Sequence, residues 1–267
     1  MSIARSAGTE EIAYDSLIIA LGSETNFFDT PGAAEHSLVL KSVDDARVVK
    51  RRIIENFERA AEIADAAVRE QQLRVVLVGG GPTGVELAGE LADYFAHECS
   101  TAFPALAEAW SVVLLQAADR LVPQVDPWFH RKALAVLRRK RVEVRTGARV
   151  VRVRADGVGF ADGTSIATRT VLWMTGVRAR PFTLHATRPV ARESRTDRII
   201  VNPYLQVPQY PDVFVVGDQA CIADRETQQP YPMRAQFAAR EGEVAAENIA
   251  RMSRHQPLVE FQWRDRG

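Results

Sequence analysis

The chain has little cysteine: Cys99 and Cys221 are its two thiols, far apart in 267 residues. No CxxC or CxxxxC pair is formed, which argues against a redox-active dithiol and against a cysteine zinc site. The five histidines show no ligand spacing either, so we expect no metal. Thiols of this kind fit a reducing compartment.

The chain also lacks an excess of either charge and a long apolar run. Lysine plus arginine number 34, as do aspartate plus glutamate, so nothing points to nucleic acid as a partner. No apolar run reaches the ~18 residues of a membrane span, and no signal peptide pattern opens the chain. We expect a soluble chain of one large domain or two small ones.

Strand and helix patterns alternate along the sequence, which predicts an α/β fold. Short apolar runs bounded by turn residues predict buried strands over residues 17–21, 73–78, 111–115, 170–174 and 213–216. Turn residues between short alternating runs predict hairpin strands within residues 142–173. Helical spacing predicts helices over residues 43–69, 85–97, 127–140 and 235–253, the first behind a capping box at Ser42.

The strongest motif is Gly79-x-Gly81-x-x-Gly84, which follows a predicted strand and opens a predicted helix. In that context Gly79 allows a tight turn, Gly81 lets a pyrophosphate approach the backbone, and Gly84 lets helix and strand pack closely. The helix N-terminus offers free N–H groups to the phosphates. The alternative is a glycine-rich turn without a ligand.

The end of the second strand should decide which nicotinamide cofactor binds, because a carboxylate there favours the ribose 2′-hydroxyl over a 2′-phosphate. Gln116 occupies that place, further from Gly79 than the usual spacing of about 20 because residues 97–110 are inserted. Glutamine repels neither sugar form, so we expect weak discrimination, with NADPH tolerated beside NADH. The alternative is a surface glutamine of no consequence.

Two carboxylate residues each have two possible roles. Glu86, two residues beyond Gly84, either complements the helix dipole or faces the nicotinamide. Asp218 follows Gly217 at the end of a predicted strand, where it either binds ligand hydroxyls or caps the next segment.

These pieces, in this order, resemble the pyridine nucleotide-disulfide oxidoreductases, flavoproteins with two dinucleotide-binding domains. Within that group the sequence resembles type II NADH dehydrogenases, the single-subunit NADH:quinone oxidoreductases. The supporting stretches are residues 14–23, 79–86, 119–123, 173–181, 215–218 and 235–238.

The resemblance implies roles for particular residues. The NAD(P)H pyrophosphate would be bound by Gly79, Gly81, Pro82, Thr83 and Gly84, and its nicotinamide nucleotide would be flanked by Gly176. The FAD ribityl chain would be bound by Gly217 and Asp218. The catalytic residues would be Glu86, near nicotinamide and flavin, and Gln236, which with Ala235 would lie beside the isoalloxazine where quinone docks.

The resemblance also implies two Rossmann-like domains, a complete NAD(P)H-binding domain inserted into an incomplete FAD-binding domain. We expect residues 14–40 and 199–267 to belong to the FAD-binding domain, residues 41–72 to form a connecting helix, and residues 73–181 to bind NAD(P)H. The sequence departs from the family in lacking a second GxGxxG before Tyr14 and a C-terminal membrane region. We therefore expect this truncated chain to bind flavin weakly or not at all.

Two single residues also differ from the family pattern. Arg240 stands where the family has a second glutamine, and Arg141 stands where it has a helix-ending glycine, at a cost of about 1 kcal/mol if its φ is positive.

The function that follows is an FAD-dependent NAD(P)H dehydrogenase that passes hydride from NADH or NADPH to FAD and electrons to a quinone. One rival is a non-catalytic NAD(P)H-binding remnant. Another is a flavoprotein reductase with a protein acceptor. By resemblance we expect a cytoplasmic protein, peripheral at the inner face of the cell membrane in the intact family member, and a homodimer.

Overall fold

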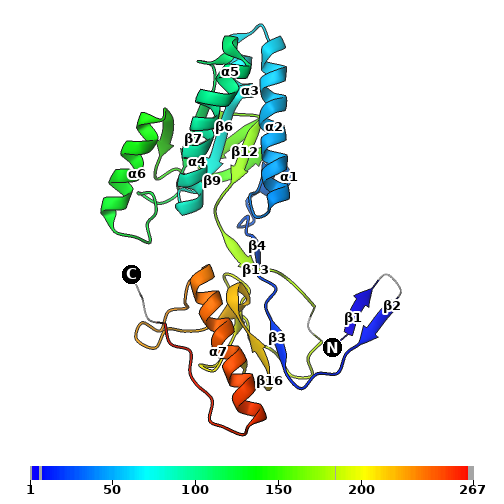
Figure 1. Ribbon diagram of the computed structural model, residues 1–267. Coiled ribbons are helices and arrows are strands. Elements are labelled where there is room, and N and C mark those ends of the chain that lie inside the picture. The colour runs from blue at the N-terminus through cyan, green and yellow to red at the C-terminus, as the bar shows by residue number, and fades with distance from the viewer. Residues whose placement is uncertain (1, 6–7, 184, 264–267) are drawn as a thin grey trace. The chain divides into compact units, whose positions relative to one another are not determined.

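The computed structural model describes residues 2–5, 8–183 and 185–263 and divides into two compact units (Figure 1). Unit 2 is the continuous segment Thr25–Gly176. Unit 1 comprises the segments on either side of it, Met1–Glu24 and Val177–Gly267. Strands β4 (Ser23–Thr25) and β13 (Val177–Ala179) pair where the chain passes from one unit to the other.

Unit 2 is built on a five-stranded parallel sheet in the order β5-β12-β6-β7-β8. Its strands are β5 (Ser37–Leu38), β6 (Arg74–Val78), β7 (Ser111–Leu115), β8 (Val142–Arg145) and β12 (Thr170–Trp173). The continuous apolar runs of β6, β7 and β12 suit strands buried on both faces. From β6 the chain adds β7 and β8 on one side and then crosses to β12 on the other, so the strand order reverses between β6 and β12.

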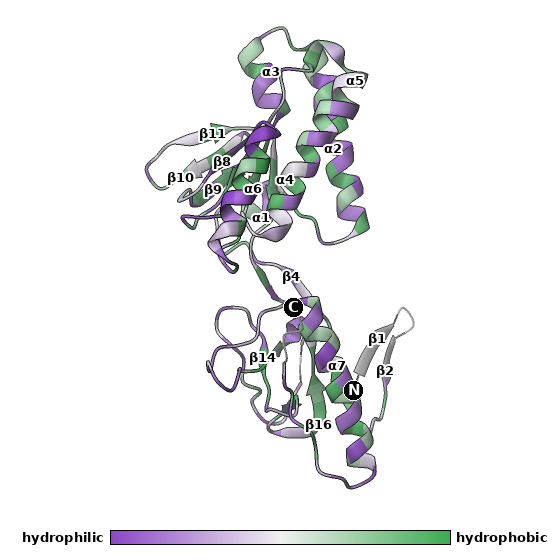
Figure 2. Ribbon diagram, turned by 60° about the vertical axis from the view of Figure 1, so that its left-hand side comes forward, coloured by the Kyte–Doolittle hydropathy of each residue, from purple (hydrophilic) through white to green (hydrophobic). Residues whose placement is uncertain are grey.

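The two faces of this sheet are covered differently. Val75, Leu77, Val112, Leu114 and Leu172 face a core shared with the helices. Their neighbours in sequence, such as Val76 and Val113, face a second core shared with a three-stranded antiparallel sheet. This alternation follows from the two-residue period of a strand. The small sheet, in the order β11-β10-β9, contains β9 (Val150–Arg154), β10 (Gly157–Phe160) and β11 (Ser165–Ala167). Figure 2 shows these strands on one side of unit 2 and α2 on the other.

Two of the long helices of unit 2, α2 and α6, begin where the sequence predicts a helix start. The long ones are α2 (Val43–Glu62), α3 (Ala66–Leu73), α4 (Pro82–Tyr94) and α6 (Pro127–Arg139). The short ones are α1 (Ala33–His36), a π-helical turn (Phe95–Cys99), α5 (Ser100–Ala102) and a 3₁₀ turn (Pro104–Leu106). The capping box at Ser42 is confirmed, since its side chain accepts from the Asp45 N–H and the Asp45 carboxylate accepts from the Ser42 N–H.

The single helix expected over residues 43–69 is wrong. The chain leaves the helix at Ile63, and Asp65 caps a second helix by accepting from the N–H groups of Ala67 and Val68. Aspartate is a strong N-cap residue, and an N-cap side chain can restart a helix wherever the backbone extends.

The expected domain boundaries differ from the two units at the N-terminal side. Residues 25–40, expected with the FAD-binding segment, and the α2–α3 region, expected as a connector, both lie in unit 2. The physical reasons are burial and strand pairing. Val49, Ile53 and Phe57 of α2 are buried in the core that the parallel sheet shares with the helices, and β5 pairs with β12. These contacts group α2 and β5 with the rest of unit 2.

Unit 1 contains a three-stranded sheet in the order β15-β16-β3, with β3 (Leu17–Ile19) parallel to β16 (Tyr210–Val215) and β15 (Gln206–Val207) antiparallel to it. Helix α7 (Ala235–Ser253) packs Phe237, Val244 and Ala245 into the same core. The remaining elements are the hairpin β1 (Ser2–Arg5) and β2 (Gly8–Glu11), the parallel pair β14 (Ile199–Ile200) and β17 (Ala220–Cys221), and a 3₁₀ turn (Gly217–Gln219).

The α/β class and most elements expected from the sequence are confirmed, with the strand at residues 111–115 and the helix at residues 235–253 matching at both ends. Arg141 does adopt a positive φ, 63°. Its guanidinium lies 5.0 Å from the centre of the Trp110 ring and 2.8 Å from the Glu108 carboxylate. These contacts offset part of the free-energy cost of a positive φ at a residue other than glycine. Among the described residues, no helix is both long and apolar enough to cross a membrane.

Gly242 offers a stability test within α7. A Cβ at this interior helix position would meet no atom within 4 Å, and its φ is ordinary. We expect Gly242→Ala to raise the free energy of unfolding of unit 1 by about 0.5–1 kcal/mol, because alanine loses less entropy than glycine in a helix. Urea denaturation checks this. A midpoint below that of the wild type would contradict the prediction and show that the added methyl group is crowded at this position.

Candidate dinucleotide-binding site

The glycine-rich turn joins β6 to α4, and two of its glycines are required by the protein's own backbone. Gly79 has φ +121°, and a Cβ there would lie 2.7 Å from the Cβ of Thr175. Gly84 is buried, and a Cβ on it would collide with the carbonyl oxygen of Gly79. Both positions therefore hold helix, turn and strand in close contact, as the sequence predicted from the motif.

Gly81 is different. It is the N-cap of α4 with φ −74° and ψ −178°, a conformation open to any residue, and a Cβ there would meet no described atom within 4 Å. It has no side chain with which to cap the helix, and Pro82 takes the first helical position, followed by Thr83. Free N–H groups and the positive end of the helix dipole therefore face open space at this turn. Nothing within the described protein requires glycine at Gly81, whereas a pyrophosphate lying against the backbone would.

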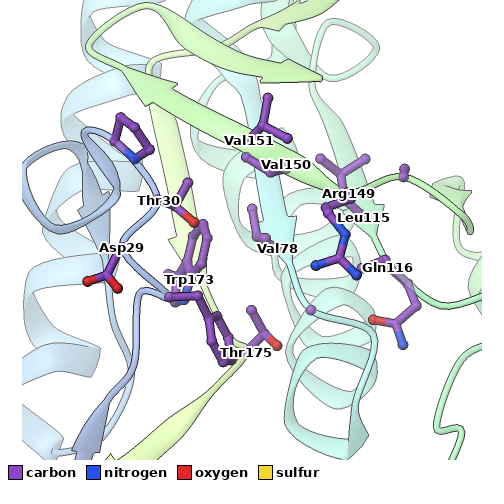
Figure 3. A pocket seen from close by; sticks show the side chains of 15 residues that line it. Asp29, Thr30, Val78, Leu115, Gln116, Arg149, Val150, Val151, Trp173 and Thr175 are labelled. Atoms are coloured by element: carbon purple, nitrogen blue, oxygen red, sulfur yellow. The ribbon is translucent and has the colours of Figure 1, made fainter. Parts of the chain in front are cut away.

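A cleft of about 500 Å³ opens beside this turn, within unit 2. Figure 3 shows it at the carboxyl ends of the strands, with Val78, Leu115 and Trp173 contributed by β6, β7 and β12. The other lining residues are Phe28, Asp29, Thr30, Pro31, Gly79, Gln116, Ala117, Ala148, Arg149, Val150, Val151 and Thr175. Reversal of the strand order between β6 and β12 makes this the crevice in which doubly wound sheets bind ligands. Its volume is in the range of small-molecule sites.

Gln116 lines the cleft, but both ends of its amide are engaged. Its Oε1 accepts from the N–H of Gly80 at 3.0 Å, and its Nε2 donates to the carbonyl oxygen of Arg120 at 3.3 Å. The side chain therefore ties the end of β7 to the glycine-rich turn. Its expected part in choosing between NADH and NADPH stays a prediction.

Gly176 lies at the end of unit 2 with φ +78°. A Cβ there would collide with the ring of Phe28, which lines the cleft, and would lie 2.6 Å from the carbonyl oxygen of Asn26. That carbonyl also accepts from Nε1 of Trp173 at 3.1 Å. Gly176 thus lets the segment before α1 approach the end of β12 and close one wall of the cleft.

Glu86 does not line the cleft. It is exposed on α4 and borders a shallow groove against α6, shared with Phe129 and Lys132. Its role near the nicotinamide stays a prediction based on resemblance.

In unit 1 the structure brings the other predicted residues to one end of α7. Gly217 has φ +66°, and a Cβ on it would lie 3.4 Å from the Cβ of Ala238 in the first turn of α7, the turn that begins with Ala235 and Gln236. Asp218 accepts from the hydroxyl of Ser23 at 2.6 Å, so its carboxylate is oriented toward hydroxyl donors.

Glu241 is a residue of this region that the sequence did not single out. It is 3% exposed and accepts from the N–H of Gly217 at 2.6 Å. Burial raises the pKa of Glu241 to about 7, against the hydrogen bond from Gly217 and the charge of Arg198, which lower it, while Asp218 raises it. The helical spacing of α7 put Glu241 near its buried face, but only the fold brings Gly217 to it.

No group of three or more His, Cys, Asp or Glu that could hold a metal ion occurs within residues 2–5, 8–183 and 185–263. Both cysteines are buried, and burial raises the pKa of the Cys99 thiol to about 11. These thiols are poor nucleophiles in this environment.

The chain is similar to known oxidoreductases. It is 33% identical over 250 residues to a probable NADH dehydrogenase of Dictyostelium discoideum, covering 92% of this chain and 54% of that protein. It is 36% identical over 224 residues to the type II NADH:quinone oxidoreductase of Mycobacterium tuberculosis, covering 80% and 48%. The chain thus spans about half the length of the curated relatives it matches.

The fold is shared with solved structures. NDH2 from Plasmodium falciparum, solved in complex with NADH, superposes with a TM-score of 0.73 at 21% identity, over 80% of this chain and 45% of that one. The Rossmann-like architecture expected from the sequence is thereby confirmed. The pyridine nucleotide-disulphide oxidoreductase family matches residues 2–242, and the chain belongs to that family.

Proposed function

We propose that unit 2 binds NADH or NADPH in its cleft, as part of an FAD-dependent NAD(P)H:quinone oxidoreductase of the type II NADH dehydrogenase branch. The observation that carries the nucleotide site is Gly81, a glycine whose backbone and surroundings leave room for a side chain. A pyrophosphate bound at the N-terminus of α4 would explain why glycine stands here, because a side chain would block its approach to the backbone. The relatives support the reaction, since they include an NADH:quinone oxidoreductase and an NAD(P)H-ubiquinone oxidoreductase.

The cleft and the glycine-rich turn beside it would bind different parts of the nucleotide. The N–H groups of the turn at Gly81 bind the pyrophosphate, and the wall formed by Gln116 and Ala117 takes the adenosine ribose at the end of β7. The nicotinamide half then extends toward the ends of β6 and β12, where Thr175 and Gly176 lie. Trp173 and Phe28 provide the apolar surface that excludes water there.

Unit 1 carries groups that fit the flavin. FAD, when bound, accepts a hydride from the nicotinamide and passes electrons onward, chemistry that no side chain supplies. Asp218 is oriented toward hydroxyl donors, as a ribityl chain would require. Gly217, with its positive φ, forms the turn between the end of β16 and Asp218. Ala235 and Gln236, at the start of α7, would lie beside the isoalloxazine. The same proposal includes a quinone as the electron acceptor, a peripheral location at the membrane and a homodimer as the assembly.

Replacing Gly81 with alanine tests the nucleotide site. The added methyl group would keep the pyrophosphate from the N–H groups, so we expect NADH affinity to fall by about 100-fold, equivalent to one or two charge-assisted hydrogen bonds. Folding stability should change by less than about 1 kcal/mol, because the methyl group meets only open space. Fluorescence titration with NADH and urea denaturation measure the two effects.

The matched control is Gly89→Ala in the same helix, where a Cβ meets Lys140 and Leu137 at ordinary distances of 3.8 and 3.9 Å. This variant should bind NADH normally. Equal NADH affinity of wild type and Gly81→Ala would refute a pyrophosphate site at this turn. Turnover with FAD and a quinone, against binding alone, separates the dehydrogenase from a non-catalytic NAD(P)H-binding protein.

A further inference from the structure

The wall of the cleft at the end of β7 is made by two adjacent strands whose ends are tied together. The N–H of Gln116 donates to the carbonyl oxygen of Arg145, and its own carbonyl oxygen accepts from the N–H of Ala148, both at 2.9 Å. A third bond, from the N–H of Gly147 to the carbonyl oxygen of Ala118, is 2.8 Å long. Arg149, the next residue along the chain, is therefore held beside the position that contacts the adenosine ribose in doubly wound sheets.

Arg149 lines the cleft on the same wall as Gln116, whereas Asp29 belongs to the opposite wall (Figure 3). Arg149 is exposed, and no described group forms a hydrogen bond or ion pair with its guanidinium. The neighbouring Arg145, by contrast, is paired with Glu143 at 2.6 Å. Among the described residues that line the cleft, Arg149 is the one cation.

The same wall lacks the carboxylate that selects a free ribose. Gln116 stands at the strand end, and its amide oxygen is already accepting from Gly80. A ribose 2′-hydroxyl would therefore find no anionic acceptor on this wall, whereas a 2′-phosphate would find an unpaired guanidinium. Arginine binds phosphate through paired N–H donors and keeps its charge at any relevant pH.

We propose that Arg149 binds the 2′-phosphate of NADPH and makes the cleft selective for the phosphorylated cofactor. This rests on the proposed function, since it names which nicotinamide nucleotide the same site prefers. Gln116 acts indirectly: it leaves the wall uncharged and fixes the glycine-rich turn, while Arg149 supplies the attraction.

The test is the affinity of the full chain for NADPH and NADH, by fluorescence titration, in the wild type and in Arg149→Gln. We expect the wild type to bind NADPH at least roughly tenfold more tightly than NADH, from one charge-assisted phosphate contact. Arg149→Gln should lose that factor for NADPH and leave NADH affinity unchanged. Competition by adenosine 2′,5′-bisphosphate against 5′-AMP should show the same ratio, without any contribution from the nicotinamide.

Arg152→Gln is the matched control. Arg152, in β9, is likewise an exposed arginine with no hydrogen-bond or ion-pair partner among the described residues, but it does not line the cleft. This variant should preserve the NADPH preference. If both cofactors bind and Arg149→Gln weakens them equally, Arg149 contacts the adenine or the pyrophosphate and the inference is wrong. An unchanged NADPH-to-NADH ratio would also overturn it. If the wild type binds neither cofactor, the proposed function itself fails.

Discussion

Glu241→Gln should remove a pH-dependent loss of stability of about 3 kcal/mol from unit 1. Burial raises the pKa of Glu241 from 4.5 to about 7, so the folded chain binds a proton that the unfolded chain has already released. This contribution is fully present below pH 4.5 and is lost as the pH rises to about 7. Glutamine mimics the protonated form, keeps an acceptor for the Gly217 N–H, and does not titrate. A shift of this size corresponds to about 3 kcal/mol.

We therefore expect wild type and Glu241→Gln to be equally stable near pH 4.5 and the variant to be more stable at pH 8. Urea denaturation across this range, with hydrogen exchange of α7 to follow unit 1, gives the difference. Glu243→Gln is the control, since Glu243 is exposed on the same helix and pairs with Arg240, a surface ion pair of at most about 1 kcal/mol. Parallel pH profiles of wild type and Glu241→Gln would mean that Glu241 is ionised in the folded chain.

Gly84→Ala should destabilise unit 2 by about 3 kcal/mol or more, within the range of severe overpacking. Its methyl group would collide with the carbonyl oxygen of Gly79 and lie 3.1 Å from the carbonyl carbon, so either α4 or the turn must move. Backbone on both sides leaves no flexible side chain to give way. Urea denaturation of the variant beside Gly89→Ala measures the effect.

The two variants separate a structural glycine from a ligand-binding one in the same motif. Gly84→Ala should lose stability, and Gly81→Ala should lose NADH affinity at nearly unchanged stability. A Gly84→Ala protein as stable as the wild type would show that α4 can withdraw from β6 without cost, contrary to their close packing.

The sequence predicts the strand, turn and helix around the glycine motif because the information is local. Apolar runs, a glycine spacing and an N-cap lie within a few residues of what they specify. The placing of Gln116 at the end of β7 follows in the same way. The engagement of its amide by Gly80 and Arg120 does not, because these partners meet it only in the folded sheet.

Arg149 and Glu241 show why the rest of the site could not be predicted. Arg149 reaches the cleft through hydrogen bonds between the ends of β7 and β8. Glu241 is an ordinary helical carboxylate until the turn after β16 brings Gly217 to it. Long-range packing likewise assigned α2 to unit 2, since its apolar stripe is visible in the sequence but its partner is not.

The continuity of unit 2 has a consequence for biosynthesis. Its two ends meet where the N–H of Asn26 donates to the carbonyl oxygen of Gly176 at 3.1 Å. Residues 25–176 leave the ribosome before β16, the strand that β3 needs as its parallel partner. The insert can therefore fold first, and by drawing its ends together it shortens the loop that must close when Leu17 finally pairs with Val213.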